Sequence, residues 1–172
     1  VPATGQVATW RVRVTTRPER RDLPLQRINI DIQTIPSCGS EPTVLRNPYR
    51  VDLGTLGMIL AAETRAEILA DKVVALALRP NRVKNRDLWD TTWLDQYDVS
   101  FERDVLASKL DARQITIESF RERYTARCRE LQNAHREFAF EMVRFLPPGQ
   151  IRESVSTPEF WTYLLNTLQS LV

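Results

Sequence analysis

The first third of the chain alternates apolar and polar residues in the manner of β-strands. Across residues 7–15 the even positions, Ala8, Trp10, Val12 and Val14, are apolar, and the odd positions are mostly polar. Because successive side chains of a strand point to opposite faces, this alternation predicts a strand with one buried face.

A second strand is predicted over residues 27–35, where Ile28, Ile30 and Ile32 share one face. The short, charged connection to the preceding strand favours an antiparallel pair. A third strand is expected over residues 58–62.

The stretch between the second and third strands, residues 36–49, contains three prolines and is predicted to be a loop. Beyond residue 63 the spacing becomes helical. Thr64 and Glu67 form a capping-box pattern at the start of a helix that should end near Arg79, because Pro80 follows. Further helices are predicted at residues 86–97, 100–110 with Ser100 as the cap, 116–145 and 157–171. This order predicts an α+β fold, a small antiparallel sheet followed by a C-terminal helical bundle.

Composition narrows the class of protein. The 172 residues have 42% apolar content and a net charge of +2, which suits a compact domain and does not indicate nucleic-acid binding by bulk charge. No apolar run is long enough to span a membrane. Cys38 and Cys128 stand far apart, so we expect a reducing, cytoplasmic location and no disulfide framework. The single histidine, His135, excludes HExxH zinc sites and Ser-His-Asp catalysis by this chain alone, and it is expected on the surface.

Three groups of residues could carry chemistry. Asp31 lies in mid-strand, where strand propensity disfavours aspartate, so it is either a metal ligand or general base, or a solvent-facing residue. Lys72 and Arg79 share a helix face about two turns apart, which would suit a triphosphate; the alternative is an amphipathic helix with extended basic side chains. Asp87 and Asp90 lie in the first turns of a helix. They are either active-site carboxylates or acidic residues that the helix dipole stabilises without any catalytic function.

These residues occur in three ordered motifs. They are I-x-I-D-I at residues 28–32, A-D-K-x-x-A-L-x-x-R at residues 70–79 and R-D-L-W-D at residues 86–90. Their order and spacing over residues 26–96 resemble the AbiEii/AbiGii nucleotidyltransferase toxins. Toxins of that family transfer nucleotides, in some cases onto RNA, and are neutralised by a partner antitoxin.

The resemblance implies a partial nucleotidyltransferase-like α+β domain over residues 1–98 and a helical C-terminal region over residues 99–172. It also implies Mg²⁺ as cofactor, a nucleoside triphosphate as substrate, an acceptor such as RNA, and an antitoxin protein as partner.

The resemblance also assigns roles by position. Asp31 corresponds to a catalytic carboxylate that binds the metal ion. Lys72 corresponds to the motif lysine near the nucleotide phosphates and is both a catalytic and a nucleotide-binding residue, with Arg79 and Arg86 as further nucleotide-binding residues. Asp87 corresponds to the catalytic aspartate of the last motif.

One element of the family pattern is missing. The first motif is a Gly-Ser followed by Asp-x-Asp, and it would lie upstream of residue 1. Gly39-Ser40-Glu41 is predicted to be part of the loop and not this motif, because no Asp-x-Asp follows it. Two-metal phosphoryl transfer needs those carboxylates, so the chain alone is expected to be inactive. Two alternatives stay open: a fragment of a longer toxin enzyme, or a catalytically inactive binding module that engages a protein partner.

Overall fold

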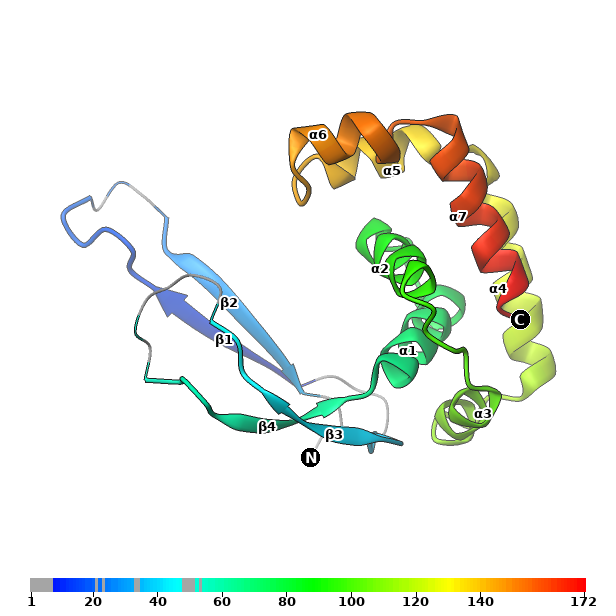
Figure 1. Cartoon of the computed structure of the whole chain (residues 1–172), viewed down its shortest axis with the longest axis horizontal. Coiled ribbons are helices and arrows are strands. Elements are labelled where there is room, and N and C mark those ends of the chain that lie inside the picture. Colours follow the sequence, from blue (N-terminus) through cyan, green and yellow to red (C-terminus); the bar gives the residue numbers. More distant parts are fainter. Residues whose placement is uncertain (1–7, 21, 23, 33–34, 48–51, 53) are drawn as a thin grey trace. The chain divides into compact units, whose positions relative to one another are not determined.

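The computed structural model describes residues 8–172 except 21, 23, 33–34, 48–51 and 53. The chain divides into two compact units, Val1–Pro36 and Ser37–Val172. In the described part of the chain, four strands in two small antiparallel sheets precede seven α-helices, which confirms the predicted α+β class (Figure 1). The predicted division between residues 98 and 99 stays a prediction.

The first unit contains a β-hairpin of β1 (Ala8–Val14) and β2 (Gln26–Ile32). Trp10 pairs with Ile30 in an antiparallel register, so the apolar side chains gather on one face as predicted. That face is not buried, however: Trp10 is 65% exposed. A two-stranded hairpin has no second layer of its own to cover an apolar face. Residue 7 of the first predicted strand and residues 33–34 of the second lie outside the described residues.

The second unit begins with β3 (Ser40–Val44), which pairs with β4 (Ile59–Glu63). The strand predicted over residues 58–62 is confirmed as β4. In contrast, β3 lies inside residues 36–49, which were predicted to be a loop, so the loop prediction was wrong. Pro42 weakened the strand signal because proline has no N–H to donate. In a two-stranded sheet every strand is an edge strand, and an edge tolerates proline.

The helices follow at nearly the predicted positions. The first two are α1 (Arg65–Leu78) and α2 (Asn85–Gln96). The third, α3 (Arg103–Asp111), starts after Glu102, so Ser100 is not its cap. The last is α7 (Pro158–Ser170), which follows α6 (Pro148–Gln150) and a π-helical turn. As predicted, the Thr157 side chain caps α7 by accepting from the N–H of Phe160 at 3.2 Å.

The long helix predicted over residues 116–145 is two helices, α4 (Ile117–Glu130) and α5 (His135–Met142), joined by a 3₁₀ turn at Leu131–Asn133. Neither proline nor glycine marks this break, although Asn133 has a low helix propensity. Leu131 at the turn and Phe138 on α5 are both buried.

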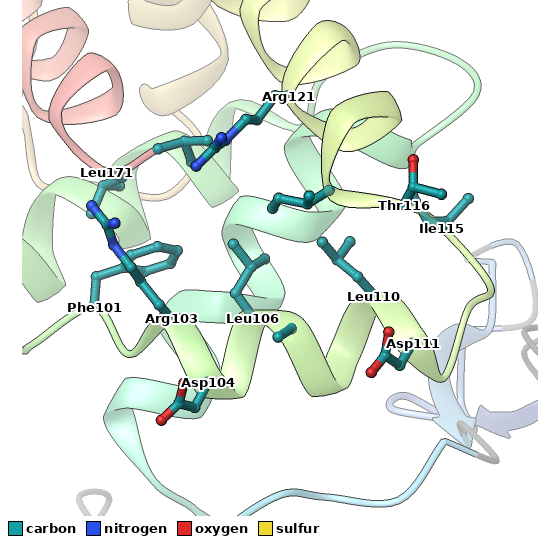
Figure 2. A pocket seen from close by; sticks show the side chains of 13 residues that line it. Phe101, Arg103, Asp104, Leu106, Leu110, Asp111, Ile115, Thr116, Arg121 and Leu171 are labelled. Carbon is teal, nitrogen blue, oxygen red and sulfur yellow. The ribbon is translucent and has the colours of Figure 1, made fainter.

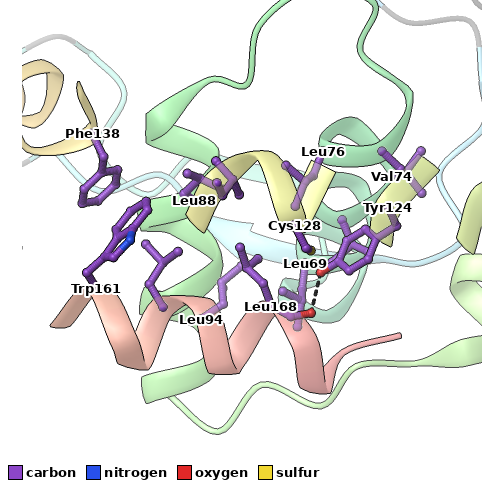
Figure 3. Close-up of a cluster of buried hydrophobic side chains, with 14 of the residues drawn as sticks. Leu69, Val74, Leu76, Leu88, Leu94, Tyr124, Cys128, Phe138, Trp161 and Leu168 are labelled. Atoms are coloured by element: carbon purple, nitrogen blue, oxygen red, sulfur yellow. Dashed lines mark hydrogen bonds between the residues drawn. The ribbon is translucent and has the colours of Figure 1, made fainter. Parts of the chain in front are cut away.

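The hydrophobic core lies among the helices of the second unit. Figure 3 shows α7 beside α4, where the Tyr124 hydroxyl donates to the Leu168 carbonyl oxygen at 2.7 Å. His135 is half-buried and stacks on Trp161 with ring centroids 5.3 Å apart, so its predicted surface position was wrong. This core fixes α1 and α2, the two helices that carry the candidate site.

Candidate active site

Lys72 lies on α1, whose buried face includes Leu69 and Val73, and Arg79 is the residue that caps the C-terminal end of this helix. The helix starts where the Thr64 hydroxyl accepts the N–H of Glu67 at 3.2 Å. It ends at Leu78 with the extended residue Arg79 as its C-cap, because Pro80 disfavours a helical residue before it and has no N–H to continue the hydrogen-bond ladder. The α2 helix packs against α1 and carries the candidate carboxylates.

Lys72, Arg79 and Asp87 form one ion-pair network. Lys72 Nζ donates to Asp87 Oδ1 at 2.9 Å, and Arg79 Nη1 donates to Asp87 Oδ2 at 2.7 Å. Lys72 Nζ also donates to Asp90 Oδ2 at 2.6 Å. Because helix positions three residues apart are neighbours, the two carboxylates of α2 reach the same ammonium group.

The network keeps its central pair ionised. Burial lowers the pKa of Lys72, but the hydrogen bonds to Asp90 and Asp87 outweigh burial and raise that pKa above its ordinary value. Burial raises the pKa of Asp87, and the hydrogen bonds from Lys72 and Arg79 outweigh it and lower that pKa. Both groups are therefore charged at neutral pH.

Helices from the C-terminal half hold the ends of α1 and α2. Arg127 of α4 donates through Nη2 to the carbonyl oxygens of Arg79 at 2.9 Å and Asn81 at 3.1 Å. Asn85, the first residue of α2, donates to Glu141 of α5 at 3.0 Å. The side chains of the network thus extend from backbone that other helices fix.

The sequence of the chain matches a known protein family. Residues 1–166 match the profile of a family described as the nucleotidyl transferase AbiEii toxin of type IV toxin–antitoxin systems. The chain belongs to this AbiEii family. No curated protein and no solved structure matches the chain. In the described part, every helix is too short or too polar to cross a membrane.

Three of the five residues predicted from the AbiEii resemblance lie in one network, in which Lys72 and Arg79 each donate a hydrogen bond to Asp87. Arg86 has a different partner, since its guanidinium carbon lies 5.4 Å from the centroid of the Phe145 ring. Asp31 lies on β2 in the first unit, and its Oδ1 accepts a hydrogen bond from the Thr9 hydroxyl at 2.7 Å. The functional roles of all five stay predictions.

Asp90 also belongs to the network; the sequence made it a candidate together with Asp87, but the resemblance assigned it no role. Its spacing from Asp87 already placed both carboxylates on one face of α2. What the spacing could not provide was the position of Lys72 between them, which depends on how α1 packs against α2.

A second group of charged residues surrounds Glu67 on α1. The capping-box prediction expected its carboxylate to return to the N–H of Thr64, and this was wrong. The carboxylate instead accepts from the Ser37 hydroxyl at 2.6 Å and from the N–H groups of Cys38 and Gly39 at 2.8 Å each. Glu67 is fully buried, so each of its oxygens needs a donor.

Lys109 of α3 completes this buried cluster. Its ammonium group pairs with Glu67 and, at 3.0 Å, with Asp71. Burial lowers the pKa of Lys109, but hydrogen bonds to Glu67 and Asp71 outweigh burial and raise it. A charged lysine in this position joins α3 to α1.

The same cluster can be tested as a metal site. Glu63, Glu67 and Asp71 place carboxylate oxygens within 4.8 Å of one another. Mg²⁺, the metal implied by the resemblance, would have to displace the Lys109 ammonium, which is 4% exposed and has the same sign of charge. The Glu67 oxygens are also already hydrogen-bonded. These residues therefore do not fit Mg²⁺.

A hollow of about 480 Å³ lies elsewhere in the second unit, between α3 and the start of α4 (Figure 2). Leu106, Leu110 and Ile115 contribute to its apolar wall, and Arg103 and Arg121 also line it. It includes no residue of the Lys72 network, so the two features are separate.

Proposed function

We propose that this AbiEii-family chain binds the triphosphate group of a nucleoside triphosphate through Lys72 and Arg79. The observation that supports this is the convergence of an ammonium and a guanidinium group on the single carboxylate of Asp87. Two cations held close together suit a polyanion, the lysine as a point charge and the arginine as a planar fork.

Asp87 has the role of a positioning residue in this proposal. Its side chain is 12% exposed, and each of its oxygens accepts from one of the two cations. The side chains of Lys72 and Arg79 are 24% and 27% exposed, so both retain a solvent-facing side. Holding the cations in advance reduces the entropy lost when the phosphates bind.

Nucleotide transfer requires more than this binding site. In the proposed reaction, an acceptor hydroxyl such as that of an RNA gives its proton to a general base and forms a bond to the α-phosphorus of the nucleotide. The bond from that phosphorus to the oxygen bridging it to the β-phosphorus breaks, and pyrophosphate leaves with the electron pair. Mg²⁺ would neutralise part of the negative charge on the phosphate oxygens. By resemblance Asp31 would offer one carboxylate to such an ion, and the two carboxylates of an Asp-x-Asp motif are missing from this sequence. We therefore propose that the chain is a fragment that binds the nucleotide and does not transfer it alone.

The first test is calorimetric titration of the chain with GTP and the other triphosphates, with and without Mg²⁺. Lys72→Ala should abolish binding, whereas Lys84→Ala should retain it, because Lys84 is an exposed lysine outside the network. The same heats in wild type and Lys72→Ala, or no binding under any condition, would reject the triphosphate site.

The alternative is a catalytically inactive module that engages a protein partner such as an antitoxin. The exposed apolar face of the hairpin, where Trp10 is 65% exposed, favours this alternative. It predicts that Asp31→Ala leaves the biological effect unchanged. Loss of the effect in a folded Asp31→Ala protein would rule it out.

A cytoplasmic location is part of the proposal for either alternative. Cys38 and Cys128 are both free thiols, and this agrees with a reducing compartment.

A further inference from the structure

We propose that Asp90 is a latch on Lys72, a carboxylate that holds the ammonium group before nucleotide binds and is displaced by the incoming triphosphate. This inference rests on the proposed triphosphate site and adds to it a residue that controls the affinity of that site.

The two carboxylates on Lys72 have unequal surroundings. Asp87 is 12% exposed, and its second oxygen is held by Arg79. Asp90 is 44% exposed, and in the described part of the chain its side chain pairs with Lys72 alone. Water can therefore solvate the Asp90 carboxylate when it leaves, whereas Asp87 would lose two cations at once.

The charge balance of the network also supports the latch. Lys72 and Arg79 are balanced by Asp87 and Asp90, so a polyanion approaching the closed network meets no net positive charge. Rotation of Asp90 into solvent leaves two cations with one carboxylate. A phosphate oxygen can then accept the hydrogen bond that Asp90 released, and the Lys72 ammonium keeps its number of partners.

The position of Asp90 on α2 allows this movement. Asp90 lies one helical turn beyond Asp87, near the outer edge of the network, and only its side chain has to rotate. If the salt bridge between Asp90 and Lys72 served stability alone, its removal would destabilise the protein without strengthening nucleotide binding.

The test uses inorganic triphosphate and GTP as probes in calorimetric titrations of the whole chain. We expect Asp90→Asn to bind both probes about tenfold more tightly than wild type, because the competing charge is lost. Asp90→Glu should keep the wild-type affinity, since it retains a carboxylate. Asp111→Asn is the matched control, because Asp111 is exposed and in the described part no side-chain partner is seen for it.

The outcomes separate the latch from the site itself. Tighter binding by Asp90→Asn but not by Asp111→Asn supports the latch. Binding by wild type that depends on Lys72, with equal or weaker binding by Asp90→Asn, overturns the latch and leaves the triphosphate site intact. No binding by either protein overturns both. In addition, NMR titration of the Lys72 side chain should show a lower pKa in Asp90→Asn, whose folding is checked by its thermal transition.

Discussion

Arg127 on α4 donates a hydrogen bond to the carbonyl oxygen of Arg79 at 2.9 Å, and this contact ties the C-terminal helices to the end of α1. The last carbonyl groups of a helix have no partner within the helix. By supplying one, Arg127 fixes the backbone from which the Arg79 side chain reaches Asp87. The helices beyond residue 100 thus have a defined structural connection to the candidate site.

The first prediction concerns this contact. Arg127→Ala should lower the free energy of unfolding by about 1–3 kcal/mol, because two backbone carbonyl groups lose a charged donor. It should also weaken triphosphate binding, because the Arg79 side chain is less well placed. Urea unfolding and calorimetry would measure the two effects. Arg123→Ala, one helical turn away and exposed, is the control, and equal results for both variants would contradict the prediction.

The second prediction concerns the buried pair of Glu67 and Lys109. Glu67→Gln or Lys109→Met should each cost about 3–5 kcal/mol, because removal of one partner leaves the other charge buried and uncompensated. The double variant should cost less than the sum of the two single variants. Urea unfolding of all four proteins forms the double-mutant cycle. Additive costs would mean that the two groups do not interact.

The third prediction is a pH dependence that comes from Glu67. Burial raises its pKa, but hydrogen bonds led by that from Lys109 outweigh burial and lower it from 4.5 to about 2. A carboxyl group whose pKa is lower in the folded state contributes stability above its unfolded-state pKa and loses it as the pH falls toward the folded-state value. Wild type should therefore lose more stability than Glu67→Gln between pH 4.5 and about pH 2. Parallel curves of unfolding free energy against pH would contradict this.

The fourth prediction is that the acidic cluster binds a divalent ion once its lysine is removed. Lys109→Met leaves the oxygens of Glu63, Glu67 and Asp71 within 4.8 Å of one another without a balancing ammonium group. Mn²⁺ should then raise the melting temperature of Lys109→Met and leave that of wild type unchanged. The double variant Glu67→Gln/Lys109→Met should lose the effect. An equal rise in wild type would show that the ammonium group does not exclude the ion.

Local sequence patterns predicted most of the helices and strands, and the elements that were predicted wrongly have physical explanations. The alternation of β1 and β2 and the Thr64 cap of α1 are local signals, so they were read correctly. β3 was missed because Pro42 is tolerated at the edge of a two-stranded sheet. The break between α4 and α5 was missed because a turn that buries Phe138 needs no proline or glycine.

The sequence by itself determined the α+β order of elements, the helix faces that carry Lys72 and Asp87, and the resemblance to AbiEii toxins that the family comparison confirmed. These features depend on spacing along the chain, which sets the direction of each side chain relative to its own helix. Tertiary structure alone decided that Asp90 joins Lys72, and that Lys109 lies among carboxylates where a metal ion could have been expected. Such pairings depend on how helices distant in sequence pack against one another, and this packing is fixed by the shared core and not by the local pattern of any single helix.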